Sequence, residues 1–290
     1  MARPLIVEFT KMNGAGNDFI VIDNRFYAFV PAELSAIAAR YCPRRTGIGA
    51  DGLLAYEVEQ DSDAHFRMRY FNADGSAATM CGNGARCIVA FAHASGARGP
   101  RLEFDTDAGR YTAEVKEGGT RVRLHVPAPD RYLPDHALES TAIPGNGQPS
   151  FIWTGTEHLV CFVDDQTQRA VSEWAPEVRN DDSLKPHGAN INAVVVPAVQ
   201  TDRARIDVRT FEKGVEHETL ACGTGALASA VVARLQEKVT SDTIDVSMPG
   251  GTLTVGIEWS GKRISRLILE GPAEKVYRGT IELRLQELRA

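Results

Sequence analysis

The chain is poor in the features that hold small secreted domains or metal sites together. Its five cysteines are odd in number, and no two of them form a Cys-x-x-Cys pair. An odd count in a chain of 290 residues argues against a disulfide framework, and the missing pair argues against a structural zinc site. The cysteines are therefore either buried, inert thiols or reactive ones.

Long apolar runs and excess positive charge are also missing. No run is long enough for a signal peptide or a membrane span, so we expect a soluble, cytoplasmic protein without a membrane partner. The net charge of −6 argues against nucleic acid as the main partner. The hydrophobic content of 43% indicates a globular chain, long enough for one large domain or two ordinary ones.

Two segments of the chain resemble each other. Residues 80–92 and 221–233 each contain Cys-Gly-x-Gly, followed by small and apolar residues in a helical pattern. The cysteines of the two motifs, Cys81 and Cys222, lie 141 positions apart, close to half the chain. This repetition indicates an internal duplication.

The surroundings of the two motifs repeat as well. One strand-like segment precedes each cysteine, and two more follow it around a glycine turn: residues 66–71, 102–106 and 111–115 in the first half, and 206–211, 244–247 and 253–257 in the second. We therefore predict an α+β fold of two pseudo-symmetric lobes. Each lobe would be a bent, mostly antiparallel sheet around a central helix, with the active site between the lobes.

The same pattern predicts the domain boundaries. The N-terminal lobe takes residues 1–128 and about 276–290, because the strand-like end of the chain returns to the first half. The C-terminal lobe takes residues 129–275, and the Pro- and Gly-rich segment 127–148 is the expected linker. A further helix is expected at residues 32–41, before a proline that would end it.

A cysteine at the start of a helix has unusual chemistry. Unpaired backbone N–H groups and the positive end of the helix dipole favour its thiolate form. The neighbouring glycines let a ligand approach, and the same N–H groups can hold a carboxylate. Two such loops facing each other would place a sulfur on each face of one carbon, the geometry that inverts a stereocentre by proton transfer. We predict a cofactor-independent amino-acid epimerase with Cys81 and Cys222 as its acid/base pair.

Other interpretations of these residues are weaker. A lone cysteine is usually a small buried hydrophobe, and this is the expectation for Cys42, Cys87 and Cys161. Residues 223–228 imitate a dinucleotide-binding fingerprint, but the preceding residues 212–219 are polar and are not expected to form a strand. No Gly-x-Ser-x-Gly motif supports a serine hydrolase.

The chain resembles the diaminopimelate epimerase family from about residue 9 to residue 281. Besides His158 and Glu212, the resemblance is carried by the blocks at residues 11–19, 47–51, 71–87, 190–192, 218–225 and 249–251. It implies a cofactor-free enzyme that interconverts LL- and meso-diaminopimelate for lysine and peptidoglycan-precursor synthesis. It also implies two lobes that close over the substrate, and it allows a homodimer.

The resemblance implies a role for each matching residue. The backbone amides of Gly82, Asn83, Gly223 and Thr224 would hold the reacting carboxylate. Asn17 would lie near the reacting end, Asn72, Asn192 and Glu212 would grip the distal end, and His158 and Glu212 would help to deprotonate the thiols. Taken singly, Asn72 could be only a turn residue after a strand, and His158 only a core or surface histidine.

The chain departs from the family pattern at the substrate grip. It has Thr156-Glu157-His158 where the family often has Asn-Pro-His, and Lys213 where an arginine usually follows the glutamate. Some members have glutamine in place of Gly52, and the loop of residues 212–222 is one residue longer than the commonest form. An ammonium is a point charge, whereas a guanidinium binds a carboxylate through two parallel bonds. Our hypothesis is that Lys213 supplies the charge toward the distal carboxylate.

Two rival functions remain open. One is a racemase for another amino acid, such as histidine, on the same fold. The other is a non-catalytic amino-acid-binding protein. An isomerase of the phenazine-biosynthesis type is disfavoured, because that branch lacks the paired cysteines.

Overall fold

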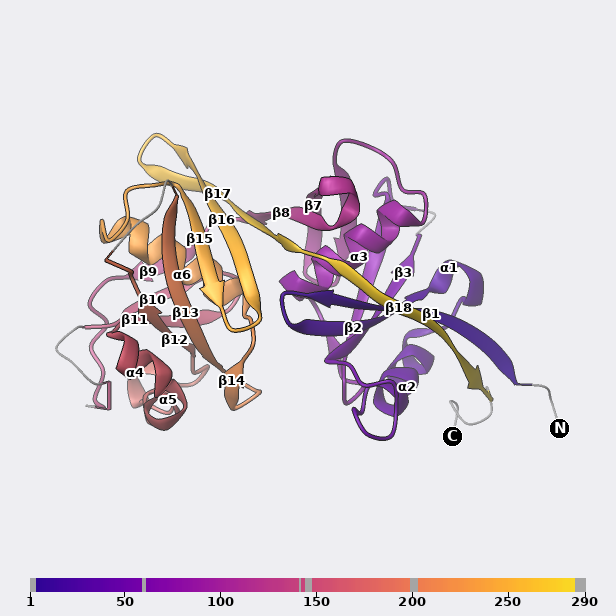
Figure 1. Ribbon diagram of the computed structural model, residues 1–290, viewed down its shortest axis with the longest axis horizontal. Coiled ribbons are helices and arrows are strands. Elements are labelled where there is room, and N and C mark those ends of the chain that lie inside the picture. The colour runs from indigo at the N-terminus through magenta and orange to yellow at the C-terminus, as the bar shows by residue number, and fades with distance from the viewer. Residues whose placement is uncertain (1–3, 59–60, 141, 144–147, 199–202, 285–290) are drawn as a thin grey trace. The chain divides into compact units, whose positions relative to one another are not determined.

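The computed structural model describes residues 4–58, 61–140, 142–143, 148–198 and 203–284. By its internal contacts the chain divides into two units (Figure 1). The first unit takes Met1–Leu124 and Gly271–Ala290, and the second takes His125–Glu270. No helix in the described part of the chain is long and apolar enough to cross a membrane.

The first unit is built on a mixed sheet. Its strands are β1 (Leu5–Gly14), β2 (Asn17–Asp23), β3 (Gly52–Glu57), β4 (Phe66–Asn72), β5 (Ala77–Ala78), β6 (Leu102–Thr106), β7 (Gly109–Lys116) and β18 (Glu274–Leu283). They pair in the order β18-β1-β2-β3-β4-β6-β7, and β5 also pairs with β4. The pairs β2–β3 and β4–β6 are parallel, and the other pairs in this order are antiparallel.

The helices of the first unit pack on opposite faces of strands β2 and β3. These helices are α1 (Asn24–Tyr27), α2 (Pro31–Tyr41) and α3 (Gly82–Ala94). Along β2, Phe19 and Val21 belong to the apolar cluster around α3, whereas Ile20 and Ile22 belong to the cluster around α2. Successive side chains of a strand point to opposite faces, so a strand buried on both faces reads as a continuous apolar run. Helix α3 contacts β1, β2, β3, β4 and β7, and it is the central helix of this unit.

The second unit repeats this design. Its strands are β9 (Asp130–Leu133), β10 (Ser150–Trp153), β11 (Glu157–Phe162), β12 (Asn190–Val195), β13 (Ala204–Glu212), β14 (His217–Thr219), β15 (Thr243–Met248), β16 (Gly251–Ser260) and β17 (Arg263–Pro272). They pair in the order β9-β10-β11-β12-β13-β15-β16-β17, with β14 also on β13, and β11–β12 and β13–β15 are parallel. Strand β8 (Arg121–Pro127) spans the boundary between the units, and β17 crosses it at its last two residues.

The connections match between the two units. In the first, α2 connects the parallel strands β2 and β3, and α3 connects β5 to β6; in the second, α4 (Asp165–Arg169) and α5 (Val171–Arg179) connect the parallel strands β11 and β12, and α6 (Gly223–Leu235) connects β14 to β15. Helix α6 contacts β10, β11, β12, β13, β15 and β16. The predicted α+β fold, with two duplicated, mostly antiparallel sheets around central helices, is confirmed.

Several local predictions are confirmed and others are wrong. The final strand pairs with β1 of the first unit as predicted, although Leu285 lies outside the described residues. The predicted linker is wrong for Asp130–Leu133, because this segment is strand β9 and pairs with β10. The polar run before Cys222 also contains a strand, β14, which is antiparallel to β13 and therefore does not supply the parallel strand of a dinucleotide fold.

Candidate active site

Cys81 and Cys222 occupy equivalent positions at the starts of α3 and α6. Each is the N-cap residue with an extended backbone, at φ −142° and ψ 120° for Cys81 and φ −122° and ψ 110° for Cys222. The sulfur of Cys81 accepts the Gly84 N–H at 3.5 Å, and that of Cys222 accepts the Gly225 N–H at 3.4 Å. Both sulfurs therefore lie at the positive end of a helix, where a thiolate is favoured.

The other cysteines are placed differently. All five are free thiols, and Cys42, Cys87 and Cys161 are buried, as is Cys222, but none of these three begins a helix. Burial raises the pKa of Cys42 and of Cys87 to about 12, and it raises the pKa of Cys161 as well. These three stay protonated at neutral pH, as expected for packing residues.

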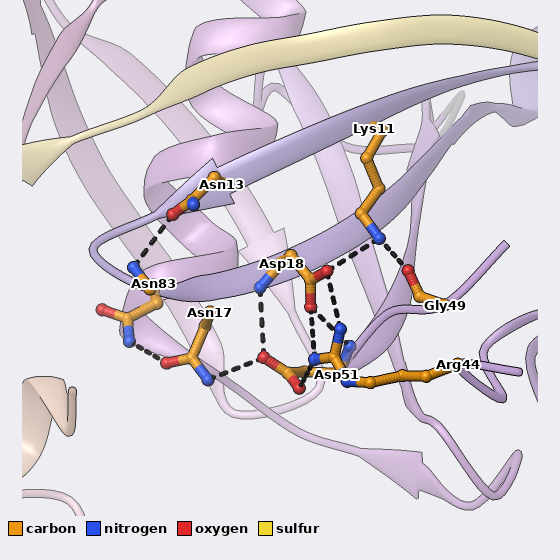
Figure 2. Close-up of polar contacts among 9 residues, drawn as sticks. Lys11, Asn13, Asn17, Asp18, Arg44, Gly49, Asp51 and Asn83 are labelled. Atoms are coloured by element: carbon orange, nitrogen blue, oxygen red, sulfur yellow. Dashed lines mark hydrogen bonds and ion pairs between the residues drawn. The ribbon is translucent and has the colours of Figure 1, made fainter. Parts of the chain in front are cut away.

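In the first unit a chain of polar contacts joins Asn17 to the start of α3 (Figure 2). The Asn83 amide donates to the side-chain oxygen of Asn17, and the Asn17 amide donates to an Asp51 carboxylate oxygen at 3.0 Å. The same carboxylate accepts the Asp18 N–H at 3.1 Å, and its second oxygen accepts from Arg44 at 2.6 Å. The structure thus brings Asn17 and Asn83 together, and Asp51 fixes the orientation of the Asn17 amide.

Asp18 anchors the outer end of this chain of contacts. Burial alone would raise the pKa of its carboxyl, but hydrogen bonds and charges from Arg44 and Lys11 outweigh burial and lower it. The Lys11 ammonium lies 2.8 Å from Asp18 and also donates to the Gly49 carbonyl (Figure 2). Asp18 therefore stays ionised at neutral pH. This network of charged side chains supports β2, the strand that begins at Asn17.

Asn72 lies at the end of β4, in a tight turn. Its backbone N–H donates to the Ser76 carbonyl at 2.9 Å, and its side-chain amide donates to the Ser76 hydroxyl at 3.0 Å. Gly75 in this turn has φ +88°, and a Cβ there would lie 2.7 Å from the Ser35 carbonyl oxygen. The residues of the turn therefore specify its conformation. Contact of Asn72 with substrate stays a prediction.

In the second unit His158 lies beside the side-chain amides of Asn190 and Asn192. His158 pairs in parallel register with Asn190, and its ring nitrogens lie 3.1 Å from the Asn192 amide nitrogen and 3.4 Å from that of Asn190. The imidazole is fully buried, which lowers its pKa to about 3, with a smaller contribution from the Lys213 charge. His158 is therefore neutral at pH 7.

Asn192 links His158 to the start of α6. Its side-chain oxygen accepts the Thr210 hydroxyl at 2.9 Å, and its amide also donates to the Leu159 carbonyl at 3.0 Å. A Cβ on Gly225 would lie 2.5 Å from that side-chain oxygen and 3.3 Å from Cys222 Cβ. Only glycine fits between Asn192 and the cysteine loop, so these predicted site residues are brought together.

The remaining predicted residues of this unit surround the same loop. Thr224 lies in the first turn of α6 after Gly223; its carbonyl accepts the Thr154 hydroxyl at 2.9 Å, and its own hydroxyl lies 3.4 Å from the Cys222 sulfur. Glu212 ends β13, and its carbonyl accepts the Glu216 N–H at 2.8 Å in the turn to β14. In the first unit, Gly82 is the first residue of α3.

Lys213 is held by two side chains from neighbouring strands. Its ammonium lies 2.5 Å from the Glu157 carboxylate, and its backbone N–H donates to the Asn190 side chain at 2.8 Å. Burial would raise the pKa of Glu157, but the hydrogen bond from Lys213 leads the contacts that lower it. No role for Glu157, Asn190 or Asp51 was predicted from the sequence. The spacing of Asn190 and Asn192, two residues apart on one strand, was the available signal that they share a face.

Nothing in the described residues suggests a metal centre. No group of three or more His, Cys, Asp and Glu side chains is placed to hold a metal ion there. Each unit instead holds one helix start with its cysteine sulfur and the side-chain amides beside it.

Comparisons with known proteins agree with this geometry. The family described as diaminopimelate epimerase matches residues 9–129 and 150–276. A diaminopimelate epimerase of Chlorobaculum tepidum is 42% identical over 275 residues, which covers 94% of this chain and 100% of the relative. One from Methanocella arvoryzae is 40% identical, over 97% of this chain and 99% of the relative.

Solved structures share the fold at low identity. A Bacillus anthracis phenazine biosynthesis protein of the PhzF family matches with a TM-score of 0.69 at 16% identity, covering 96% of this chain and 99% of that one. A hydroxyproline epimerase from Agrobacterium vitis matches with a TM-score of 0.66 at 14% identity, covering 97% and 93%. The sequence matches narrow this shared fold to one branch: the chain belongs to the diaminopimelate epimerase family.

Proposed function

We propose that this protein interconverts LL- and meso-2,6-diaminopimelate by proton transfer at the α-carbon, with Cys81 and Cys222 as the two acid/base groups. One observation carries the proposal. Each cysteine is the N-cap of the central helix of one duplicated unit, and each sulfur accepts the N–H three residues on. Family membership supplies the substrate, and the reaction would serve lysine and peptidoglycan-precursor synthesis in the cytoplasm.

The proposed reaction moves one proton on each face of the substrate carbon. One cysteine, as thiolate, takes the α-hydrogen, while the opposite thiol gives its proton to the other face. The electron pair left on the carbon is shared with the adjacent carboxylate. Backbone amides of Gly82, Asn83, Gly223 and Thr224, at the two helix starts, would stabilise the added negative charge. The reaction would require both sulfurs to reach the same substrate carbon.

The rest of the proposed site grips and orients the substrate. Asn17, fixed by Asp51, would lie beside the reacting end. Asn72, Asn192 and Glu212 would hold the distal amino-acid end, with Lys213 supplying positive charge. His158 and Glu212 would take up thiol protons. For His158 this requires its surroundings to change when substrate binds, because the buried imidazole, with its pKa of about 3, is a weak base.

A second candidate is a racemase for another amino acid, such as histidine. The pairing of Lys213 with Glu157 favours this candidate, because part of the positive charge at the predicted distal grip is already compensated within the protein. This candidate keeps the cysteine chemistry and changes only the substrate.

The deciding experiment is α-proton exchange in deuterated water, followed by NMR with reduced protein. LL-diaminopimelate, L-histidine and other L-amino acids would be tested with wild type, Cys81→Ala and Cys222→Ala. Cys161→Ala, a buried cysteine outside the site, is the matched control and should keep wild-type exchange. Exchange with diaminopimelate that both site variants abolish supports the proposal, and sedimentation of the same samples would test for the expected homodimer.

The other outcomes separate the rivals. Exchange with another amino acid only would move the assignment to a racemase. Binding without any exchange would leave a non-catalytic amino-acid-binding protein. Full exchange in either site variant would overturn the two-cysteine mechanism.

A further inference from the structure

The two cysteine-bearing helices differ at one buried position. Helices α3 and α6 have the same length, and their N-cap cysteines and the glycines three residues on are equivalent. Five residues after the cysteine, however, α3 carries Arg86 and α6 carries Leu227. Both side chains are buried, at 0% and 1% exposure. One unit therefore has a cation where the other has a hydrocarbon.

The Arg86 guanidinium folds back toward the start of α3. It donates to the Asn83 side-chain oxygen at 2.7 Å, to the Gly82 carbonyl at 3.3 Å and to the Gly14 carbonyl at 3.4 Å. Its Nε donates to the Pro272 carbonyl at 3.3 Å. Two of these acceptors belong to the residues directly after Cys81. The positive charge therefore lies within the first turn of the helix.

Arg86 has no carboxylate partner among the described residues. Its hydrogen bonds all go to neutral oxygens. A buried charge without an ionic partner is costly, and burial lowers the pKa of this guanidinium to about 10. An arginine without an ionic partner is unusual in a protein core. At the equivalent position of the other unit the residue is a leucine.

The titratable groups around Arg86 leave one candidate for its counter-charge. They are Cys81, which caps α3, Cys87 within α3, and Arg121 of β8. Arg121 is itself a cation, whose Nε lies 3.6 Å from the Glu117 carboxylate. Cys87 is fully buried with a pKa of about 12, so it stays a thiol. Among the described residues near Arg86, only Cys81 can carry a negative charge.

We propose that Arg86 is a positioning residue whose charge holds Cys81 as the thiolate in the free enzyme, while Cys222 rests as the thiol. The inference rests on the proposed function, because it assigns starting protonation states to that pair. The proton of Cys81 goes to solvent. In the first turnover, Cys81 takes the α-hydrogen and Cys222 gives its proton. The isomer whose α-hydrogen faces Cys81 is therefore the one that reacts directly with the resting enzyme.

The test measures the pH midpoint of alkylation at each cysteine, without substrate. Reduced enzyme is treated with iodoacetamide under single-hit conditions across a pH series, and the peptides containing Cys81 and Cys222 are quantified by mass spectrometry. The midpoint for Cys81 should lie about 1 pH unit or more below that for Cys222, as expected for a nearby opposite charge. Equal midpoints, or a lower one for Cys222, would overturn the proposal even if no variant folds.

Variants then separate charge from packing. Arg86→Leu copies the residue of the second unit and should raise the Cys81 midpoint toward that of Cys222. Arg86→Lys keeps the charge and should stay close to wild type. Leu227→Met, at the equivalent position of α6, is the matched control and should leave both midpoints unchanged. A folded Arg86→Leu variant with an unchanged Cys81 midpoint, or with both midpoints shifted equally, would reduce Arg86 to a structural residue.

The assay also keeps the two proposals apart. Because alkylation needs no substrate, the difference between the midpoints can hold when diaminopimelate exchange fails. It can equally fail when exchange is observed.

Discussion

The Lys213 ammonium donates to a carboxylate oxygen of Glu157 at 2.5 Å, and the Thr156 hydroxyl donates to the same oxygen at 3.1 Å. The Lys213 and Glu157 side chains are only 25% and 16% exposed. Thr156, Glu157 and Lys213 are three of the positions at which the chain departs from its family's usual pattern, and the structure joins them into one contact group. An ammonium has three donors, so Lys213 can hold Glu157 and still offer donors to a ligand.

Replacing Lys213 by alanine should weaken use of diaminopimelate. If the ammonium reaches the distal carboxylate, its removal loses a charge-assisted hydrogen bond worth about 1.5–3 kcal/mol, or roughly 10- to 100-fold in kcat/KM. The loss should appear mainly in KM, measured by the exchange assay. Lys185→Ala, which removes an exposed lysine paired with Asp182, is the matched control. Unchanged diaminopimelate kinetics in Lys213→Ala would sink the hypothesis that Lys213 supplies the charge.

Replacing Glu157 by glutamine should have the opposite effect. The amide keeps a hydrogen-bond acceptor for Lys213 but removes the compensating charge, so the distal site becomes more positive. KM for diaminopimelate should fall several-fold. In a Lys213→Ala background the same change should lower KM by a different factor, since a double-mutant cycle isolates the interaction between the two residues. A KM that rises, or that falls equally in both backgrounds, would count against this account.

The sequence predicts the parts of the site that are local in the chain. The Cys-Gly-x-Gly motif specifies its own geometry, because the cysteine caps the helix that its glycines begin. The alternating strand patterns are likewise local in the chain, and they predict the strands of the sheets. Helices α4 and α5 were missed, because the segment is polar and α5 contains Pro176, which usually argues against a helix interior.

Contacts between distant segments were beyond prediction. Lys213 and Glu157 are separated by 56 residues, and Asn17 and Asp51 by 34. No periodicity joins such pairs; only the order and register of the folded strands brings them together. Arg86 is a related case: the duplication identifies it as different from Leu227, but only the structure shows its lack of a carboxylate partner among the described residues.

Asp51 should matter for catalysis without touching the substrate. Asp51→Asn leaves one oxygen to serve Asn17, the Asp18 N–H and Arg44, so the Asn17 amide loses its fixed orientation. We expect kcat to fall about 5-fold, the equivalent of one hydrogen bond of about 1 kcal/mol. Asp63→Asn, at an exposed aspartate paired with Arg110, should leave kcat unchanged. If both variants behave alike, Asp51 does not position Asn17.

His158 should make stability depend on pH. Its folded pKa of about 3 lies below the ordinary 6.5, because burial disfavours the charged ring. Between these values the unfolded chain binds a proton that the folded protein does not, so the stabilisation is complete above pH 6.5 and is lost as pH falls. From pH 7 to pH 5, His158 should account for about 2 kcal/mol of lost unfolding free energy.

Urea unfolding at the two pH values checks this linkage. His158→Gln should lose about 2 kcal/mol less than wild type over this interval. His217→Gln, at an exposed histidine, should follow wild type. Parallel curves for His158→Gln and wild type would show that the imidazole is not held neutral in the folded protein.

Gly84 and Gly225 occupy equivalent positions in the two duplicated units, so the same substitution can be compared at both. A Cβ on Gly225 would lie 2.5 Å from the Asn192 side-chain oxygen and 3.1 Å from Thr210 Oγ1, both of which are fully buried. These two groups are bonded to each other at 2.9 Å and cannot move apart without leaving buried polar atoms unpaired. A Cβ on Gly84 would instead meet the end of the Leu54 side chain at 3.2 Å, which can shift.

Gly225→Ala should therefore lose about 1–3 kcal/mol of unfolding free energy and nearly all exchange activity, whereas Gly84→Ala should lose clearly less of both. Equal losses in denaturant unfolding and in the exchange assay would mean that the contact between Gly225 and Asn192 does not set the shape of the Cys222 loop.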